Sequence, residues 1–259
     1  MTGCFKSPKV IVGTGWWCDG RVSDWLIGDP FLKSASFFPL WHALVMRALN
    51  PAAIFVTDSH SPVKPDVSSL DRVNWTQLDA NYGHAMDIRT GRIATKYSGF
   101  TRSLMLGASF ALCCDADYYV YLEQDCIIRG EHFLQAALSG TREPILVGGR
   151  TVQGRGLNPD GSAQPMYQQA LVIVERSALE RFIAGLMRGP ETDGELSPEL
   201  KMERDCTPFG LLPIPYGRSR PIDFTRSHYY AQHLTAEEFA EFVRSEGIDL
   251  KTTRHARGC

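Results

Sequence analysis

One stretch decides the fold: Asp117-Tyr118-Tyr119-Val120-Tyr121-Leu122-Glu123-Gln124-Asp125. Its apolar, aromatic and β-branched run predicts a buried strand. The run ends at two acids, Glu123 and Asp125, which flank Gln124 and therefore point to the same side of an extended chain. Carboxylates at the carboxyl end of a strand face the crevice where open α/β sheets bind ligands, and they suit a hard divalent cation that neutralises a diphosphate. Two solvated acids at a strand end are the competing interpretation.

Strands and helices alternate on both sides of this stretch. Turn and cap signals bound the segments, as at Asn50-Pro51, where a helical pattern stops. The alternation predicts an α/β sandwich with a mainly parallel central sheet. The expected strands are 10–13, 53–57, 73–78, 117–122, 144–148 and 169–174, and the expected helices are 37–49, 97–114, 131–138, 177–187 and 236–245.

Composition excludes several classes of protein. The 259 residues are 44% hydrophobic and 22% charged, which is typical of a globular chain rather than a disordered one. A net charge of -2 gives no reason to expect a nucleic acid or an anionic membrane as partner. We find no signal-peptide pattern and no transmembrane segment. Seven cysteines without a CxxC pair indicate reduced thiols and a cytoplasmic location. Loose association with a membrane stays open for a lipid-linked acceptor.

These features together resemble the GT-A fold glycosyltransferases. The resemblance rests on a first strand with its loop (10–17), a second strand ending at Asp58, and a helix leading to the strand that ends in the acid-x-acid triplet. It covers residues 1–175 as topology and implies a Rossmann-like GT-A type α/β/α sandwich. The usual triplet is Asp-x-Asp, from which Glu123 departs. The resemblance implies that Asp125 binds Mn²⁺ or Mg²⁺ and that Glu123 contacts the ribose or the metal.

Further candidates for nucleotide binding lie at strand ends and at a helix start. Asp58 would accept hydrogen bonds from a base or ribose, unless it only caps the turn at 59–62. Thr14 and Gly15 follow the first strand and would lie beside it. Arg102 and its neighbour Lys96 would reach a phosphate from the start of the helix at 97–114, with solvated cations as the alternative.

The C-terminal part carries acids and arginines that suit the same chemistry. An inverting sugar transfer needs a carboxylate base, for which we predict Glu203 first and Asp205 second, with Glu199 as a further candidate. A proline-rich loop at 212–223 presents Arg218 and Arg220, and paired guanidinium groups on a rigid loop suit a diphosphate. A structural crossover with solvent-facing arginines is the alternative.

The resemblance also implies a late histidine on the metal. His233, just before the helix cap at Thr235, is the first candidate, and His228 competes with it. Imidazole is an acceptable ligand for Mn²⁺. A structural histidine is the alternative for either residue.

The sequence therefore predicts a metal-dependent glycosyltransferase that moves a sugar, hexosyl or related, from a nucleotide-diphosphate sugar to a glycan or other hydroxyl acceptor. We expect one domain over 1–250, with a nucleotide-sugar-binding half (1–130) and an acceptor-binding half (131–250), and a flexible tail at 251–259. Two alternatives remain, a sugar-phosphate nucleotidyltransferase and a non-catalytic glycosyltransferase-like binding protein. A loop from Gly13 to Gly20 without Lys or Arg disfavours the first, and the retained acids disfavour the second.

Overall fold

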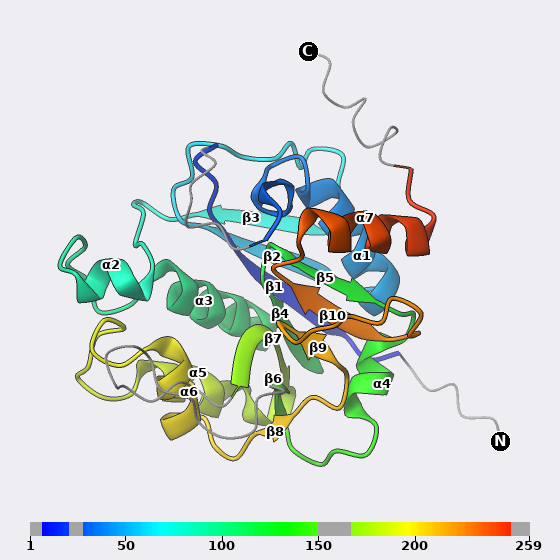
Figure 1. Cartoon of the computed structure of the whole chain (residues 1–259). Coiled ribbons are helices and arrows are strands. Elements are labelled where there is room, and N and C mark those ends of the chain that lie inside the picture. The colour runs from blue at the N-terminus through cyan, green and yellow to red at the C-terminus, as the bar shows by residue number, and fades with distance from the viewer. Residues whose placement is uncertain (1–6, 21–27, 150–166, 250–259) are drawn as a thin grey trace.

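A central sheet of seven strands organises the chain (Figure 1). The computed structural model describes residues 7–20, 28–149 and 167–249. The strand order is β3-β2-β1-β4-β7-β6-β8, in which only β7 runs antiparallel to its neighbours. The strands are β1 (Val10–Trp16), β2 (Ala53–Asp58), β3 (Val73–Gln77), β4 (Tyr118–Leu122), β6 (Ile145–Gly149), β7 (Tyr167–Glu175) and β8 (Gly210–Leu211).

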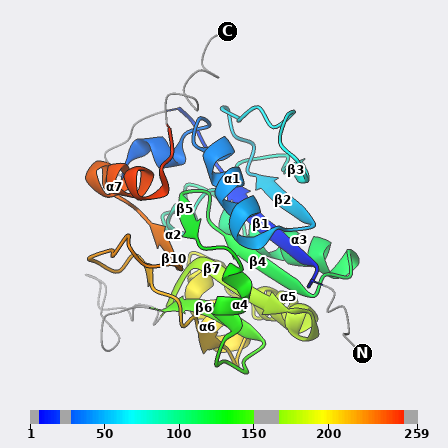
Figure 2. The same cartoon turned by 90° about the vertical axis from the view of Figure 1, so that its right-hand side faces the viewer.

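Helices cover both faces of this sheet, so the predicted α/β/α sandwich with a mainly parallel sheet is confirmed. One face carries α1 (Phe38–Leu49), α4 (Phe133–Leu138) and α7 (Ala236–Glu246). The other carries α3 (Gly99–Cys113), α5 (Leu179–Met187) and α6 (Pro198–Asp205). Figure 2 looks onto the face with α1 and α4. Shorter helices are α2 (Ala85–Arg89) and the 3-10 turns η1 (Pro30–Lys33) and η2 (Arg176–Ala178).

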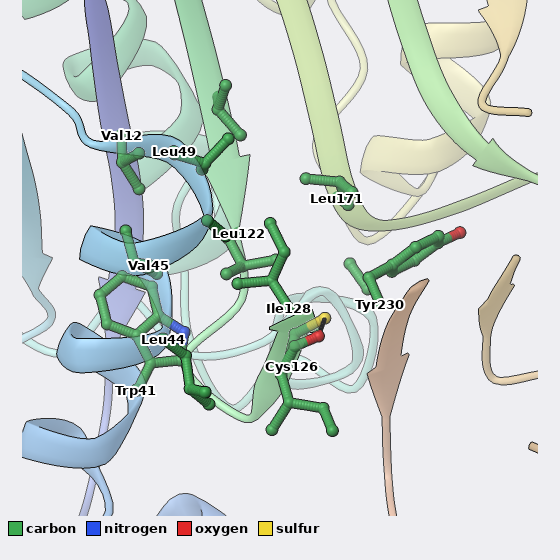
Figure 3. Packing of buried hydrophobic residues seen from close by; sticks show 14 of the residues in the cluster. Val12, Trp41, Leu44, Val45, Leu49, Leu122, Cys126, Ile128, Leu171 and Tyr230 are labelled. Atoms are coloured by element: carbon green, nitrogen blue, oxygen red, sulfur yellow. Dashed lines mark hydrogen bonds between the residues drawn. The ribbon is translucent and has the colours of Figure 1, made fainter. Parts of the chain in front are cut away.

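A second sheet of three short strands packs on the α1 face. Its order is β5 (Cys126–Arg129), β10 (Tyr229–Gln232) and β9 (Tyr216–Gly217). In Figure 1 these strands lie side by side, although β9 and β10 come from the last fifth of the chain. Figure 3 shows apolar side chains of α1, β4, β5 and β10 gathered in one cluster, which fixes the small sheet against the large one.

Local signals account for the helix ends. Ser98 caps α3 by accepting a hydrogen bond from the Thr101 N–H. The predicted cap at Thr235 is confirmed, because Thr235 and Glu238 form a reciprocal capping box on α7. Asn50 ends α1 in the left-handed conformation at φ 41°, which asparagine tolerates better than most residues.

The structure differs from the predicted elements at several points. β1 extends to Trp16, so Thr14 and Gly15 are strand residues paired beside β2 and not part of a loop. The small sheet and α2 were not expected, because strands of two to four residues and a helix of five leave little periodicity to read. The predicted tail at 251–259 and the segment 150–166 lie outside the described residues.

Candidate functional site

The acid triplet is held rigidly at the carboxyl end of β4. The Glu123 N–H donates to the Ala170 carbonyl on β7 at 3.0 Å, and the Glu123 carbonyl accepts from the indole of Trp41 at 3.2 Å. Gln124 is tied to the end of β1, since its Oε1 accepts from the Trp17 N–H at 2.7 Å and its Nε2 donates to the Trp17 carbonyl at 2.8 Å. Three strands and a helix therefore fix the backbone between the two acids.

The small sheet brings Gln232 onto both acids. In the β5–β10 pairing, Gln232 stands opposite Cys126, the residue after Asp125. Its side-chain Nε2 donates to Asp125 Oδ1 at 2.9 Å and also to Glu123 Oε2. Gln232 and Asp125 are almost fully buried, while Glu123 is partly exposed. Both carboxylates therefore accept a hydrogen bond from the same amide nitrogen.

The second oxygen of Asp125 faces two basic groups. His233 Nε2 lies 3.7 Å from Asp125 Oδ2, and the ammonium of Lys33 lies 3.5 Å from the same atom. His233 has a φ of 57°, an uncommon conformation for a residue with a side chain and one that is often found at functional sites. Of the two histidine candidates, the structure brings His233 to Asp125. His228 instead contacts the Glu131 carbonyl at 2.9 Å.

The two arginines of the predicted loop, Arg218 and Arg220, both donate hydrogen bonds to Gln232. The parallel pairing of β9 with β10 sets Arg218 level with Gln232, and Arg218 Nε donates to Gln232 Oε1 at 2.9 Å. Arg220 donates to the carbonyls of Gln232 and His233 at 2.9 and 3.1 Å and pairs with Glu238 at 2.5 Å. Arg218 therefore lies in the charged cluster, and Arg220 fixes the turn that carries His233.

Burial and mutual charge set the protonation of the cluster. Burial, followed by the charge of Asp125, raises the pKa of Glu123 to about 7, against the opposing effect of Arg218. Burial, opposed by the charge of Asp125 and assisted by Arg218 and Lys33, lowers the pKa of His233 to about 4. His233 is therefore neutral near pH 7, which is the form in which imidazole binds a metal.

The donor set fits a divalent cation held jointly with a substrate. Donor atoms that bind one ion at about 2.1 Å lie about 3.0 Å apart at a right angle and about 4.2 Å apart when opposite. The 3.7 Å between Asp125 Oδ2 and His233 Nε2 falls in this range. Within the described ranges, no group of three or more His, Cys, Asp or Glu side chains is arranged as a ready-made cage. Mg²⁺-type sites usually complete their shell with water and substrate phosphates.

Asp58 has the capping role that was the alternative to nucleotide binding. Its Oδ1 accepts from the Ser61 N–H at 2.8 Å. Its Oδ2 lies 3.3 Å from both the Lys64 ammonium and the Trp75 indole nitrogen. The side chain is fully buried. A contact between Asp58 and a nucleotide stays a prediction.

Among the contacts described, three other nucleotide-binding candidates make no hydrogen bond or ion pair with the side chains of Glu123 and Asp125. Thr14 is buried within β1, and Gly15 packs against Ser103 and Tyr121, where an added Cβ would come 3.0 Å from Ser103 Oγ. Arg102 donates to Tyr97 O at 3.1 Å and to Thr95 Oγ1 at 2.9 Å, and it lies over the Tyr82 ring. Their roles toward a nucleotide stay predictions.

The three base candidates share α6 but not one environment. Asp205 pairs with Arg204 at 2.7 Å and lies at the far end of the helix from Glu199. Glu199 is in the first turn, where its backbone carbonyl accepts from the Tyr167 hydroxyl of β7. The charge of Glu199 also raises the pKa of Glu123, although less than burial and the charge of Asp125 do. Glu203 lies one turn further along. Of these three acids, Glu199 is among the charges that raise the pKa of Glu123.

Sequence reasoning missed Lys33 and Gln232. A strand at 229–232 would have revealed Gln232 and His233 as polar residues at a strand end, the same signal that marked Glu123 and Asp125. The apolar run Tyr229-Tyr230-Ala231 precedes these two polar residues, but three residues are too few to predict a strand. Lys33 had no comparable signal, because its place depends on tertiary packing.

A separate shallow hollow of about 790 Å³ lies at the opposite end of β4, beside Asp117 and Arg176. It contains none of the predicted site residues. In the part of the chain that the structure describes, no helix is long and apolar enough to cross a membrane, and the five cysteines there are free.

Comparisons with known proteins show similarity of arrangement only. No family model and no curated protein matches the chain. Among solved structures, TarS from S. aureus is 12% identical over 91% of this chain, with a TM-score of 0.48, and its fragment 1–349 with UDP is 12% identical over 92%, with a TM-score of 0.46. The chain spans only 38% and 64% of those two chains.

A putative glucose-1-phosphate thymidylyltransferase from Bacillus anthracis, in complex with a sucrose, is 11% identical. The match covers 93% of this chain and 96% of that one, with a TM-score of 0.48. At these identities and TM-scores the likeness extends to no activity, ligand or partner of this chain.

Proposed function

We propose that this chain is a metal-dependent glycosyltransferase that moves a hexosyl or related group from a nucleotide-diphosphate sugar to a hydroxyl acceptor such as a glycan. One observation carries the proposal: Glu123, Asp125 and His233 meet at the carboxyl end of β4, with Arg218 beside them. Two acids, a neutral imidazole and a guanidinium at this edge of the sheet suit a cation and a diphosphate together.

The protein's own groups then have distinct roles. A Mn²⁺ or Mg²⁺ held by Asp125 and His233, with Glu123 beside it, would supply Lewis-acid stabilisation of the departing diphosphate. Arg218 would bind an oxygen of the same diphosphate. Gln232 would keep the two carboxylates in register, because its amide contacts both. Arg220 would hold the turn of His233 in place.

For an inverting transfer, Glu199 becomes the first candidate for the base. Its charge acts on Glu123, whereas Asp205 is paired with Arg204. Glu203 remains the second candidate. A base takes the proton of the acceptor hydroxyl while that oxygen attacks the anomeric carbon. If the transfer retains configuration, this role disappears and Glu199→Gln leaves most of the activity.

The remaining residues divide between the two halves of the proposed domain. Thr14, Gly15, Asp58 and Arg102 would line the nucleotide-binding half, 1–130. The acceptor would bind in the half 131–250. This division and the single domain over 1–250 are proposals.

The test is a turnover screen with purified chain and Mn²⁺. UDP- and GDP-sugars serve as donors, and release of the free nucleoside diphosphate is measured with and without glycan acceptors. We expect turnover of at least one donor, with loss after EDTA and in Asp125→Asn. Asp115→Asn is the matched control, because Asp115 pairs with Arg176 near the other end of β4. Turnover that survives both EDTA and Asp125→Asn would exclude the metal role.

Two further arms separate the alternatives. Release of pyrophosphate from a nucleoside triphosphate and a sugar 1-phosphate would assign a nucleotidyltransferase. Residues 17–20 after β1 carry no Lys or Arg for a triphosphate, which disfavours this outcome. A thermal shift with UDP or GDP and Mn²⁺, without turnover of any donor, would assign a binding protein.

A further inference from the structure

The ammonium of Lys33 lies beside the Asp125 oxygen that a bound cation would also contact. The Asp125 side chain is 6% exposed, and its Oδ2 faces the Lys33 ammonium at 3.5 Å and His233 Nε2 at 3.7 Å. A buried carboxylate is stable only with a compensating charge or hydrogen bonds. Among the contacts described, the Lys33 ammonium is the basic group nearest to that oxygen.

The position of Lys33 is built into the fold. It ends η1, which is capped by the Asp29 carboxylate through the Phe31 N–H at 2.9 Å. The Asp29 N–H donates to the Leu234 carbonyl at 2.6 Å, so η1 is docked on the turn that carries His233. Gly28, at φ 89°, allows this close approach, because a Cβ there would come 2.8 Å from the His233 backbone.

A cation and this ammonium cannot share Asp125 Oδ2 at low cost. An ion bound at about 2.1 Å from Oδ2 would stand within a few ångströms of a second positive charge, in a site with little water to screen the repulsion. The Lys33 side chain is 25% exposed, so it has a way out toward solvent. Entry of the cation therefore requires Lys33 to leave Asp125.

We propose that Lys33 is the counter-ion of Asp125 in the cation-free protein and that it sets the affinity of this site for the divalent cation. When a cation binds Asp125, the ammonium is released and becomes available to an oxygen of the diphosphate beside the ion. This inference rests on the proposed cation site. The effect of Lys33 on metal affinity can be measured without the transfer reaction.

The experiment measures Mn²⁺ binding by calorimetry, in the absence of nucleotide, on the whole chain. We expect Lys33→Met to bind Mn²⁺ about five- to tenfold more tightly than the wild type, because one competing charge is gone. Lys33→Arg keeps the charge and should bind close to the wild type. Lys64→Met is the matched control, because Lys64 pairs at 3.3 Å with another buried carboxylate, Asp58, and should leave Mn²⁺ affinity unchanged.

A second readout does not depend on metal. In EDTA, Lys33→Met should melt at a lower temperature than the wild type, since Asp125 has lost its counter-ion, and Mn²⁺ should raise its melting temperature by more than that of the wild type. Equal or weaker Mn²⁺ affinity in Lys33→Met would overturn the inference while leaving the cation site intact. If neither protein binds Mn²⁺, with or without UDP, both the inference and the metal-dependent function fail.

Discussion

The Gln232 amide donates to Asp125 at 2.9 Å across 107 residues of sequence. The contact follows from register, because Gln232 is paired with Cys126 in the small sheet and Cys126 follows Asp125 directly. The same amide reaches Glu123, so one side chain on β10 aligns two acids that leave β4. The geometry of the site is therefore set by the pairing of two four-residue strands.

Replacing Gln232 should lower the stability of the protein, because the two neighbouring carboxylates then lose the amide donor that they share. Gln232→Met keeps the volume but removes the shared donor, so Glu123 and Asp125 lose a hydrogen bond each. We expect the free energy of unfolding to fall by about 1–3 kcal/mol in the absence of metal, measured by urea denaturation. Mn²⁺ should restore part of the loss. An unchanged midpoint in EDTA would show that the amide does not stabilise the pair.

The two histidines should behave differently toward the metal. His233→Asn keeps a residue that tolerates φ 57° but removes the imidazole. We expect Mn²⁺ affinity to fall at least about tenfold, since even outer-shell partners of metal ligands contribute that much. His228→Asn is the control, because His228 contacts Glu131, and its affinity should match the wild type. Equal affinities in calorimetry would remove His233 from the proposed ligand set.

The residue between the acids should tolerate little change. Gln124 both donates to and accepts from the backbone of Trp17, which ties β4 to β1. Gln124→Glu keeps the acceptor and loses the donor, whereas Gln124→Ala loses both. Each hydrogen bond contributes about 0.5–1.5 kcal/mol, so we expect the unfolding free energy to fall in that order. Equal stability of all three proteins in urea would contradict this.

The buried pair of Lys201 and Asp193 should be strongly coupled. The two groups are 2.9 Å apart and fully buried, and the other Asp193 oxygen accepts from Ser98 and Thr101 at the start of α3. Lys201→Met leaves the carboxylate without its partner and should reduce the free energy of unfolding by about 3–5 kcal/mol. Adding Asp193→Asn should recover part of that loss. A double-mutant cycle with purely additive terms would argue against coupling.

Gln169 offers an opposite test, a substitution that stabilises. Its side chain is 3% exposed, and in the described part of the chain neither its Oε1 nor its Nε2 has a hydrogen-bond partner. Gln169→Leu removes two unsatisfied polar atoms and should raise the free energy of unfolding by about 1 kcal/mol. A lower melting temperature in Gln169→Leu would mean that bound water satisfies the amide.

Most of the large sheet was predictable from sequence. Runs such as 118–122 and 170–174 are continuously apolar, as strands buried on both faces require, and the helices between them show clear periodicity. Glu123 and Asp125 were recognisable for the same reason, since a charge pair ends an apolar run abruptly.

The remainder of the site was harder to predict because it depends on contacts between distant segments. β9 and β10 together have six residues, too few for a pattern, yet their register decides which of His228 and His233 reaches Asp125. Lys33 lies 92 residues before Asp125, and its place follows from a turn docked on Leu234. Asp58 shows that a strand-end acid can also serve the fold through a buried turn, so this signal alone does not separate the two roles.

The late position of β10 in the sequence has a consequence for folding during synthesis. On the ribosome, Glu123 and Asp125 emerge long before Gln232 and His233 do, so for that interval the carboxylates have neither their amide nor their imidazole. A nascent chain in which the large sheet has already collapsed would carry two like charges at an unfinished edge. The cluster would then be completed only after the segment that carries Gln232 and His233 has emerged.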